Sequence, residues 1–189
     1  MLINNAGVGQ RGLVLDTQFE VYRQVIEMDF FAPLRLTQLV LPAMVERRSG
    51  RIAILASVAG KVGAPLRSGH SAAKHACLGY YDALRAEVEQ NCGIGVSVVV
   101  PGTISTQIGA NALLPDGSTS GEADSLSQNA YSPEAAAAQV LDGLASGVRE
   151  IWVAEGAELG ALNLRVGNPE MLFDMAAQLV ASRVDGGSR

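Results

Sequence analysis

The stretch Arg51-Ile52-Ala53-Ile54-Leu55-Ala56 decides the fold class, because it is an almost unbroken apolar run. A second apolar run, at residues 94–100, ends at Pro101-Gly102, which stops a strand. Runs that are apolar on both faces of the strand are typical of parallel sheets, in which helices cover both faces. The two runs therefore predict strands inside an α/β domain.

Helical segments alternate with these strands. Residues 29–48 carry apolar side chains at roughly helical spacing, and Pro33 suits the first turn of that helix. Ser132 and Pro133 are typical of the N-cap and first position of a later helix. The other predicted elements are strands at 1–4 and 150–154, helices at 17–24 (with Asp16 as N-cap), 71–90, 133–146 and 160–183 (with a break near 167–169), and a loop at 103–131. This alternation predicts a parallel sheet with helices on both faces.

The composition narrows the class of protein. The chain has 189 residues, of which 48% are hydrophobic and 17% charged, as expected for one globular domain. Its net charge of −5, without a run of Lys or Arg, gives no support for nucleic-acid binding. No apolar stretch is long enough to span a bilayer, and Met1 is not followed by a signal-type segment. Cys77 and Cys92 lack metal-ligand spacing, so we expect reduced thiols, no metal site and a cytoplasmic location.

The chain opens inside an apolar strand, Met1-Leu2-Ile3, although domains usually begin in polar, frayed segments. This opening predicts that a front part of the sheet is missing from the sequence. We expect residues 1–184 to form a single partial domain and residues 185–189 to be a disordered tail.

Residues 7–12, Gly7-Val8-Gly9-Gln10-Arg11-Gly12, spell a dinucleotide-binding fingerprint, G-x-G-x-x-G, and Asp29 lies where a ribose-binding acid would be expected. This interpretation would make the chain start at the first strand of a complete dinucleotide fold. It requires residues 22–29 to be a second strand, yet nothing separates them from the helices on either side. We therefore interpret the fingerprint as a coincidence in a chain with 21 glycines.

Four short motifs carry a more specific signal, and they cover nearly the whole chain. They are Asn4-Asn5-Ala6-Gly7, Ser57-Val58-Ala59-Gly60-Lys61, Ser71-Ala72-Ala73-Lys74 and Pro101-Gly102-Thr103-Ile104-Ser105-Thr106. In this order and at this spacing they resemble the motifs of the short-chain dehydrogenase/reductase family. The resemblance implies the C-terminal part of a doubly wound, Rossmann-like parallel sheet, with strands four to seven present and the front three missing.

The resemblance also implies the chemistry, which is hydride transfer between NAD or NADP and an alcohol or carbonyl. Ser57 would polarise the substrate oxygen, and Lys74 would hold the nicotinamide ribose and tune the proton donor. Two positions depart from the family pattern: His70 stands where the family has Tyr, and Asp29 stands where it has Asn. The implied cofactor-binding residues are Asn5, Ala6, Gly7, Lys74, Pro101, Gly102, Ile104 and Thr106.

His70 is the departure with the larger expected effect. An imidazole can exchange protons near neutral pH, but Lys74 disfavours its charged form. The ring is also shorter than a phenol by about 2 Å, and misplacement by about 1 Å can cost a hundredfold in rate. We therefore expect a weak catalyst or none. Asp29 is less damaging, since an ionised carboxylate can still accept hydrogen bonds from water or Lys74.

The segment that should hold the cofactor's pyrophosphate, a Gly-rich turn before the first helix of the fold, has no counterpart in this sequence. We expect no measurable NAD(H) or NADP(H) affinity for the isolated 189 residues. The alternative function is an inactive relative that serves as a binding or dimerisation partner. A ligand-binding module without redox chemistry is a third possibility.

The resemblance extends to partners. The loop at residues 103–131 occupies the place of the family's substrate loop. The motifs Asn111-Ala112-Leu113, Asp116-Gly117 and Ser132-Pro133-Glu134 resemble a branch of the family that contains lipophilic-carbonyl and steroid reductases, so the substrate would be a small, lipophilic alcohol or carbonyl. The alternative interpretation is a mobile loop rich in Gly and Ser. The helices at 29–48 and 71–90 correspond to the family's dimer face, which implies a homo-oligomer. Its candidate contact residues are Phe30, Phe31, Leu78, Tyr81 and Leu84.

Overall fold

A computed structural model describes residues 1–122 and 130–186. Four parallel strands form one sheet in the order β1-β2-β3-β4, with bounds Leu2–Asn4, Gly50–Leu55, Ile94–Pro101 and Glu150–Val153. In the register of the central strands, Ile54 of β2 lies opposite Asn4 of β1 and Val98 of β3. The two runs that opened the sequence analysis are therefore the adjacent central strands, and their prediction is confirmed.

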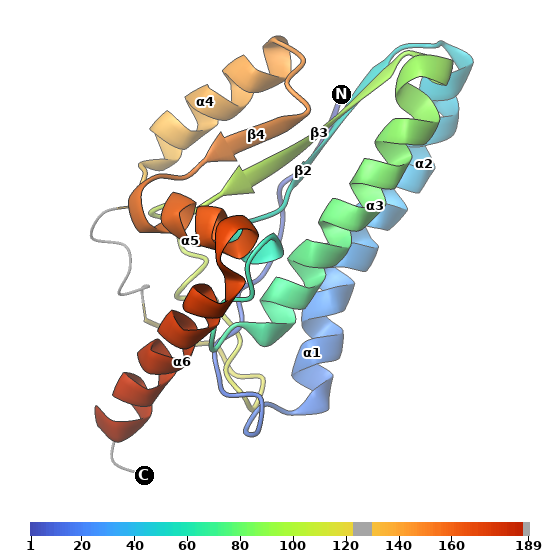
Figure 1. Cartoon of the computed structure of the whole chain (residues 1–189). Helices are drawn as coiled ribbons and strands as arrows, with labels where there is room; N and C mark the ends of the chain where they lie inside the picture. The colour runs from blue at the N-terminus through green and yellow to red at the C-terminus, as the bar shows by residue number, and fades with distance from the viewer. Residues whose placement is uncertain (123–129, 187–189) are drawn as a thin grey trace.

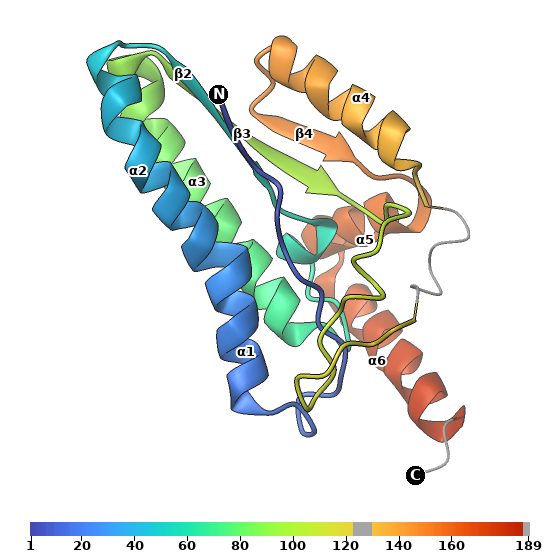
Figure 2. The ribbon, with the colours of Figure 1, turned by 180° about the vertical axis from the view of Figure 1, so that it is seen from behind.

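Helices lie on both faces of this sheet (Figures 1 and 2). The helix bounds are α1 Phe19–Ile26, η1 Glu27–Phe31, α2 Ala32–Glu46, η2 Val58–Gly60, α3 Ser68–Cys92, α4 Pro133–Ala145, α5 Gly156–Gly167 and α6 Pro169–Gly186. On one face, α1, η1 and α2 form one long helical rod that packs beside α3, and α4 covers the other face. Helices α5 and α6 follow the last strand, near the carboxyl ends of β3 and β4. The arrangement is the predicted parallel sheet between two helical layers.

The alternation of side chains along the strands explains why both layers are needed. Ile52 and Ile54 of β2 belong to a core shared with α2 and α3, whereas Ala53 between them belongs to a core shared with α4. Successive residues of a strand point to opposite faces, so an apolar residue at each position must be covered on both sides. The first core is completed by Met44, Ala56, Cys77, Tyr81, Leu84, Val88, Ile94, Val96, Val98 and Val100, and the second by Val99, Ala136, Leu144, Ile151 and Val153.

The long helical rod differs from the prediction. The sequence suggested separate helices at 17–24 and 29–48, but α1, the π-helical turn η1 and α2 follow one another without a break from Phe19 to Glu46. Asp16 is not the N-cap, since that position is Gln18, whose side chain makes no capping hydrogen bond. The π turn begins at Glu27, between the two predicted helices, and includes the first three residues of the second one.

The remaining elements agree more closely with the prediction. Ser132 caps α4 by accepting a hydrogen bond from the backbone N–H of Ala135, and Pro133 is at its first position. The predicted break near residues 167–169 separates α5 from α6. The described part of the 103–131 loop has isolated bridges only, and residues 123–129 lie outside the described residues. Helix α6 continues through Gly186, two residues into the predicted tail, and residues 187–189 are not described.

A small polar cluster lies inside the first core. Asn4 Nδ2 donates to Tyr81 OH at 3.0 Å and to Thr37 Oγ1 at 3.1 Å, and these two hydroxyls are 2.8 Å apart. All three residues are buried, and burial raises the pKa of Tyr81 to about 12, against the lowering effect of the hydrogen bond with Thr37. The cluster ties the end of β1 to both helices of the layer that covers it.

Tyr81→Phe is expected to lower the free energy of unfolding by about 1–3 kcal/mol, because the amide of Asn4 loses a buried partner. Urea unfolding followed by circular dichroism measures this loss. Tyr80→Phe is the matched control, since the Tyr80 ring packs against Phe30 and Tyr81 and no hydrogen bond of its hydroxyl is found among the described residues. Equal stabilities of the two variants would contradict the role given to the cluster.

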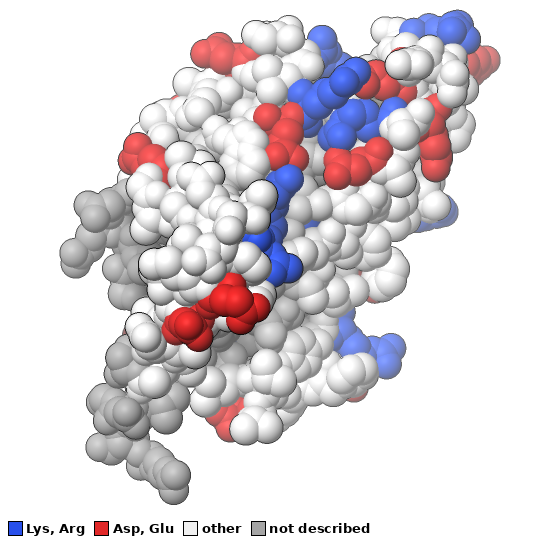
Figure 3. Space-filling view, viewed as in Figure 1, with Lys and Arg blue, Asp and Glu red and all other residues white. Residues whose placement is uncertain are grey.

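Two further features concern the described residues as a whole. No helix among them is both long and apolar enough to cross a membrane, and no three His, Cys, Asp or Glu side chains gather as metal ligands. On the face shown in Figure 3, acidic and basic side chains lie interspersed instead of forming one continuous charged surface.

Candidate active site

The predicted site residues follow the carboxyl ends of three neighbouring strands. Asn5 comes directly after β1, Ser57 lies two residues beyond β2, and Gly102 follows β3. The carboxyl ends of parallel strands meet at one edge of a sheet, and ligands of open α/β proteins bind outside that edge. The fold thus brings segments that are far apart in the sequence to one place.

The centre of the site is a buried cluster of Asp29, His70 and Lys74. Asp29 Oδ2 lies 3.2 Å from His70 Nδ1 and 3.5 Å from Lys74 Nζ, and Asp29 Oδ1 accepts from the backbone N–H of Val8 at 2.7 Å. Lys74 Nζ also donates to the carbonyl oxygen of Leu55 at 3.1 Å. The side chains of Asp29, His70 and Lys74 are 0%, 10% and 6% exposed, so these three groups are largely removed from water.

Local structure explains this convergence. His70 and Lys74 are four residues apart near the start of α3, so both side chains lie on one face of that helix. Asp29 is in the π turn η1, which packs against α3. Gly7 allows the chain after β1 to approach, because a Cβ there would lie 3.0 Å from Asp29 Oδ1 and 3.3 Å from Lys74 Nζ.

The cluster keeps Asp29 ionised. Burial alone raises the pKa of this carboxyl, but the interaction with His70, the charge of Lys74 and the N–H of Val8 outweigh burial and hold the pKa below its ordinary value. Burial raises the pKa of the neighbouring Cys77 to about 11, against the lowering effect of Lys74. The Cys77 thiol therefore stays protonated, and its Sγ donates to the backbone oxygen of Asp29 at 3.2 Å.

Ser57 lies beyond the end of β2 as the N-cap of the short helix η2. Its Oγ accepts from the backbone N–H of Ala59 at 3.1 Å and makes a long contact of 3.5 Å with the carbonyl oxygen of Pro101. Ser57 is half-buried. These contacts connect the β2 and β3 ends of the site.

The turn after β3 is covered by a residue that the sequence analysis missed. Glu158 of α5 accepts hydrogen bonds from both the backbone N–H and the hydroxyl of Thr103, each at 2.8 Å. Its carboxylate also lies where a Cβ of Gly102 would be. Ile104 pairs with Tyr131, and Thr106 is exposed. No sequence motif joins Glu158 to residues more than fifty positions earlier, so only the fold could place it there.

Other predicted residues are distributed differently. Asn5, Ala6 and Gly7 are exposed, and the buried asparagine of that motif is Asn4. Of the residues expected at the dimer face, Tyr81 and Leu84 lie in the core, whereas Phe31 is 48% exposed. Tyr81 and Leu84 are therefore packing residues, because they face the sheet.

The fingerprint reading of residues 7–12 does not fit the structure. No helix begins at Gly12, whose N–H donates to the carbonyl oxygen of Leu66, and the next helix starts at Phe19. Residues 8–12 instead run beside the loop after β3, with Gln10 paired to Leu113 (Figure 2). Asp29 is helical and belongs to the cluster with His70. The rejection of this motif is confirmed.

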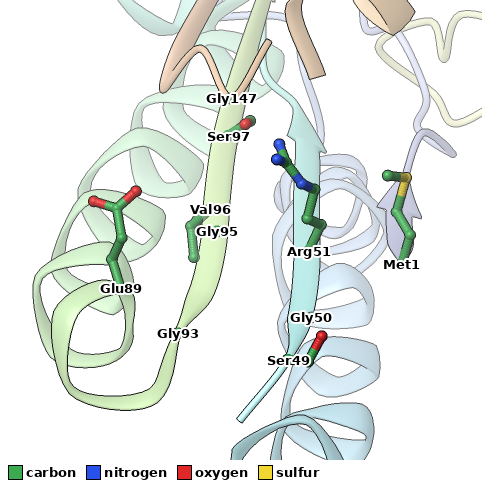
Figure 4. Close-up of a pocket in the computed structure, with 10 residues that line it drawn as sticks. All are labelled: Met1, Ser49, Gly50, Arg51, Glu89, Gly93, Gly95, Val96, Ser97 and Gly147. Carbon is green, nitrogen blue, oxygen red and sulfur yellow. The ribbon is translucent and has the colours of Figure 1, made fainter. Parts of the chain in front are cut away.

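A hollow of about 460 Å³ lies at the opposite end of the sheet (Figure 4). It is bordered by Gly50 and Arg51 at the start of β2 and by Gly93 and Gly95 around the start of β3. The Arg51 guanidinium donates to the carbonyl oxygen of Leu144. None of the predicted site residues lines this hollow, which lies at the amino ends of the strands.

A parallel sheet between helical layers, with a polar cluster beyond the strands' carboxyl ends, defines an open α/β protein with its site at that edge. The family model for short chain dehydrogenases matches residues 1–115. The chain belongs to the short-chain dehydrogenase/reductase family, and the predicted family is confirmed.

Two relatives show how much of a family member's length this chain matches. The chain is 39% identical over 183 residues to dehydrogenase/reductase SDR family member 7B of Bos taurus, covering 97% of this chain and 55% of that protein. It is 40% identical over 177 residues to the Danio rerio protein of the same name, covering 94% and 57%. The chain thus spans little more than half the length of these relatives.

Solved structures agree with the fold. A short-chain dehydrogenase from Streptomyces avermitilis superposes with a TM-score of 0.72 at 28% identity, over 100% of this chain and 70% of that one. A short chain dehydrogenase from Burkholderia cenocepacia in complex with NADP gives a TM-score of 0.74 at 25% identity, over 90% and 66%. The Rossmann-like class of the sheet is therefore established.

Proposed function

We propose that this protein is an oxidoreductase that transfers hydride between NAD or NADP and a small alcohol or carbonyl compound. The observation that carries the proposal is the buried Asp29–His70–Lys74 cluster beside the carboxyl ends of the strands. The NADP complex of the Burkholderia cenocepacia relative supports a nicotinamide cofactor of this kind. A lipophilic substrate suits the proposal, because the loop at residues 103–131 resembles that of lipophilic-carbonyl reductases.

The residues that face the reaction have distinct roles. Ser57 would turn its hydroxyl from the long contact with Pro101 to the substrate oxygen. His70 would exchange a proton with that oxygen. When bound, the nicotinamide supplies or accepts the hydride. Because the imidazole is about 2 Å shorter than a phenol, we expect a slower reaction than in relatives with Tyr.

The donor set at Lys74 fits the ribose of the cofactor. An ammonium group has three N–H donors. One is directed to the Leu55 carbonyl and another faces Asp29, which leaves the third for a ribose hydroxyl. At the turn after β3, Glu158 accepts from both donors of Thr103, so a carboxamide oxygen would bind to these donors in place of the Glu158 carboxylate. The other proposed cofactor-binding residues are Asn5, Ala6, Gly7, Pro101, Gly102, Ile104 and Thr106.

The pyrophosphate would be held outside residues 1–189. In doubly wound folds it sits over a Gly-rich turn at the first helix. Within the described residues β1 pairs on one side only, and Ile3 on it is 41% exposed. Together with the greater length of the relatives, this open edge supports three further strands in the complete protein. Residues 1–184 would then be part of one domain.

Homo-oligomerisation through α2 and α3 is part of the same proposal. Leu36, Leu39 and Val45 of α2 are exposed at 49%, 59% and 38% and could form an apolar contact with a second copy of the chain. These residues can supply the apolar contacts that Tyr81 and Leu84 cannot. Sedimentation of the protein as a monomer at micromolar concentration would contradict this part.

The test of the function uses the full polypeptide with NADH or NADPH deuterated at the reactive nicotinamide carbon and a panel of aliphatic, aromatic and cyclic ketones and aldehydes. We expect deuterium in the alcohol product, detected by mass spectrometry. Ser57→Ala should lower the rate about a hundredfold. Ser49→Ala, at the amino end of the sheet, is the control and should leave it unchanged. Absence of deuterium transfer to every compound would reject the function.

A further inference from the structure

The two departures from the family pattern are in contact with each other. His70 replaces the family's Tyr and Asp29 its Asn, and the structure brings His70 Nδ1 to 3.2 Å from Asp29 Oδ2. We propose that Asp29 and His70 act together in proton transfer, an inference that rests on the proposed function. Asp29 is a positioning residue that, with the Val8 carbonyl, keeps a proton on His70 Nδ1. It thereby makes Nε2 the atom that exchanges a proton with the substrate oxygen.

The tautomer follows from the atoms around Nδ1. This nitrogen lies 3.1 Å from the carbonyl oxygen of Val8 as well as 3.2 Å from Asp29 Oδ2. A carbonyl oxygen and an ionised carboxylate only accept hydrogen bonds. A bare Nδ1 would direct its lone pair at two acceptors, so the proton must be on Nδ1. The Val8 carbonyl is the better aligned acceptor, since Asp29 Oδ2 completes no well-formed hydrogen bond among the described residues.

The opposite ring nitrogen is left available. Among the described residues no hydrogen bond joins His70 Nε2 to any protein atom, and Nε2 is not one of the fully enclosed polar atoms that lack a partner. The side chain retains 10% exposure. With Nδ1 fixed against the protein, Nε2 is the edge of the ring that a substrate can reach.

The surrounding charges also support the pair. The titratable groups facing His70 are Asp29 from η1 and Lys74 from α3, with the protonated thiol of Cys77 behind Asp29. From the sequence alone, Lys74 opposed a charged imidazole. The structure places the Asp29 carboxylate in contact with both groups, so a negative charge lies beside the ammonium and the imidazole together.

The proton transfer balances as follows for carbonyl reduction. A bound reduced nicotinamide would supply the hydride for the new C–H bond, losing its own C–H bond and becoming oxidised, and the π electrons of the carbonyl would move to its oxygen. The Nε2–H bond of the imidazolium breaks, its electron pair stays on nitrogen, and the proton forms the O–H bond of the alcohol. The ring becomes the neutral Nδ1–H tautomer, which is the form that Val8 and Asp29 hold. Alcohol oxidation runs through the same steps in reverse.

The first test reads the tautomer directly in the 189-residue chain. Nitrogen-15 spectra of labelled histidine distinguish a protonated Nδ1 from a bare one, and His75→Gln removes the signals of the only other histidine. We expect a protonated Nδ1 in the neutral ring of His70. Asp29→Asn should shift the Nδ1 resonance part of the way toward the unprotonated range, because the amide N–H₂ would face this nitrogen while the Val8 carbonyl still accepts from it. A bare Nδ1 in the unsubstituted protein overturns the proposal, even if the Asn variant fails to fold.

The second test compares four versions of the full polypeptide in the deuteride-transfer assay. With His70 in place, Asp29→Asn should lower kcat roughly a hundredfold with little change in KM. His70→Tyr alone should raise kcat about tenfold or more. Adding Asp29→Asn to His70→Tyr should raise it further, because a carboxylate beside a phenol opposes phenolate formation.

The decisive result is that Asp29→Asn lowers kcat when His70 is present and raises kcat when it is combined with His70→Tyr. A purely structural Asp29 would give a loss in both backgrounds, and that outcome contradicts the pair. An unchanged rate in Asp29→Asn with His70 present also contradicts it. If no version transfers deuteride while Nδ1 is protonated as expected, the proposed function fails and the tautomer assignment stands. The two failures are therefore distinguishable.

Discussion

Lys74→Met is expected to lower turnover about a thousandfold and to reduce the free energy of unfolding by roughly 3–5 kcal/mol. The side chain is 6% exposed and its ammonium contacts the fully buried Asp29, so methionine fills the space but leaves a carboxylate without its cation. Deuteride transfer in the full polypeptide measures the first effect, and urea unfolding followed by circular dichroism measures the second. The matched control is Lys61→Met, which breaks a more exposed pair with Glu150.

Lys74→Met should also change how the free energy of unfolding depends on pH in acid. The pKa of Asp29 in the folded protein is below its ordinary value, so its contribution to stability is complete above the unfolded-state pKa of about 3.9. That contribution is lost as the pH falls through the folded pKa. In Lys74→Met the burial that raises the pKa of Asp29 is opposed by fewer groups, so the acid loss should begin at a higher pH. Unfolding curves between pH 3 and pH 7 that differ by a constant amount would contradict this account.

Gly60→Ala is expected to lower turnover about a hundredfold, although residue 60 has no functional group. A Cβ at this position would lie 2.8 Å from the backbone oxygen of Lys74 and 2.9 Å from its carbonyl carbon. Backbone cannot rotate away as a flexible side chain can, so η2 and α3 must separate and carry Lys74 with them. Displacement of a catalytic group by about 1 Å is enough for a loss of this size.

Gly63→Ala provides the control for this prediction. It lies three residues further along, and a Cβ there would meet no atom within 4 Å. We expect Gly60→Ala also to lose about 1–3 kcal/mol of stability through overpacking, while Gly63→Ala keeps both rate and stability. Equal rates in the two variants would show that the close approach of η2 and α3 does not position Lys74.

The strands could be predicted almost to the residue, because an apolar run that needs covering on both faces has few alternatives. β2 and β3 each differ from the predicted bounds by one residue or less at either end. The helices were less predictable. The residue types at Glu27–Phe31 do not distinguish a π turn from an α-helix. The i→i+5 hydrogen bonds of this turn depend on the packing of η1 against α3, which is tertiary structure. Local sequence therefore indicated a boundary where the chain in fact continues as helix.

The family motifs identified candidates for the site, but not how they interact. His70 and Lys74 could be paired in advance, since they are one helical turn apart. The contact of Asp29 with both of them depends on the orientation of a separate helix, so the Asp29 and His70 departures could not be linked in advance. Glu158 and the buried Asn4 were missed for the same reason, because their partners are distant in the sequence. The catalytic and cofactor roles themselves stay predictions.

The wide turn of η1 has a consequence for insertions and deletions. An α-helix closes its hydrogen bonds from residue i to i+4, whereas the π turn closes them from i to i+5. The turn therefore holds one residue more than the α-helical turn that it replaces, and α1 and α2 keep the faces that bury Val21 and Val25 on one side and Thr37 and Met44 on the other. Removing one residue from Glu27–Phe31 would leave a regular α-helix in which these two faces stay aligned. The carboxylate of Asp29 lies inside the turn, so its direction would change with the length of the turn while the packing of α1 and α2 would not.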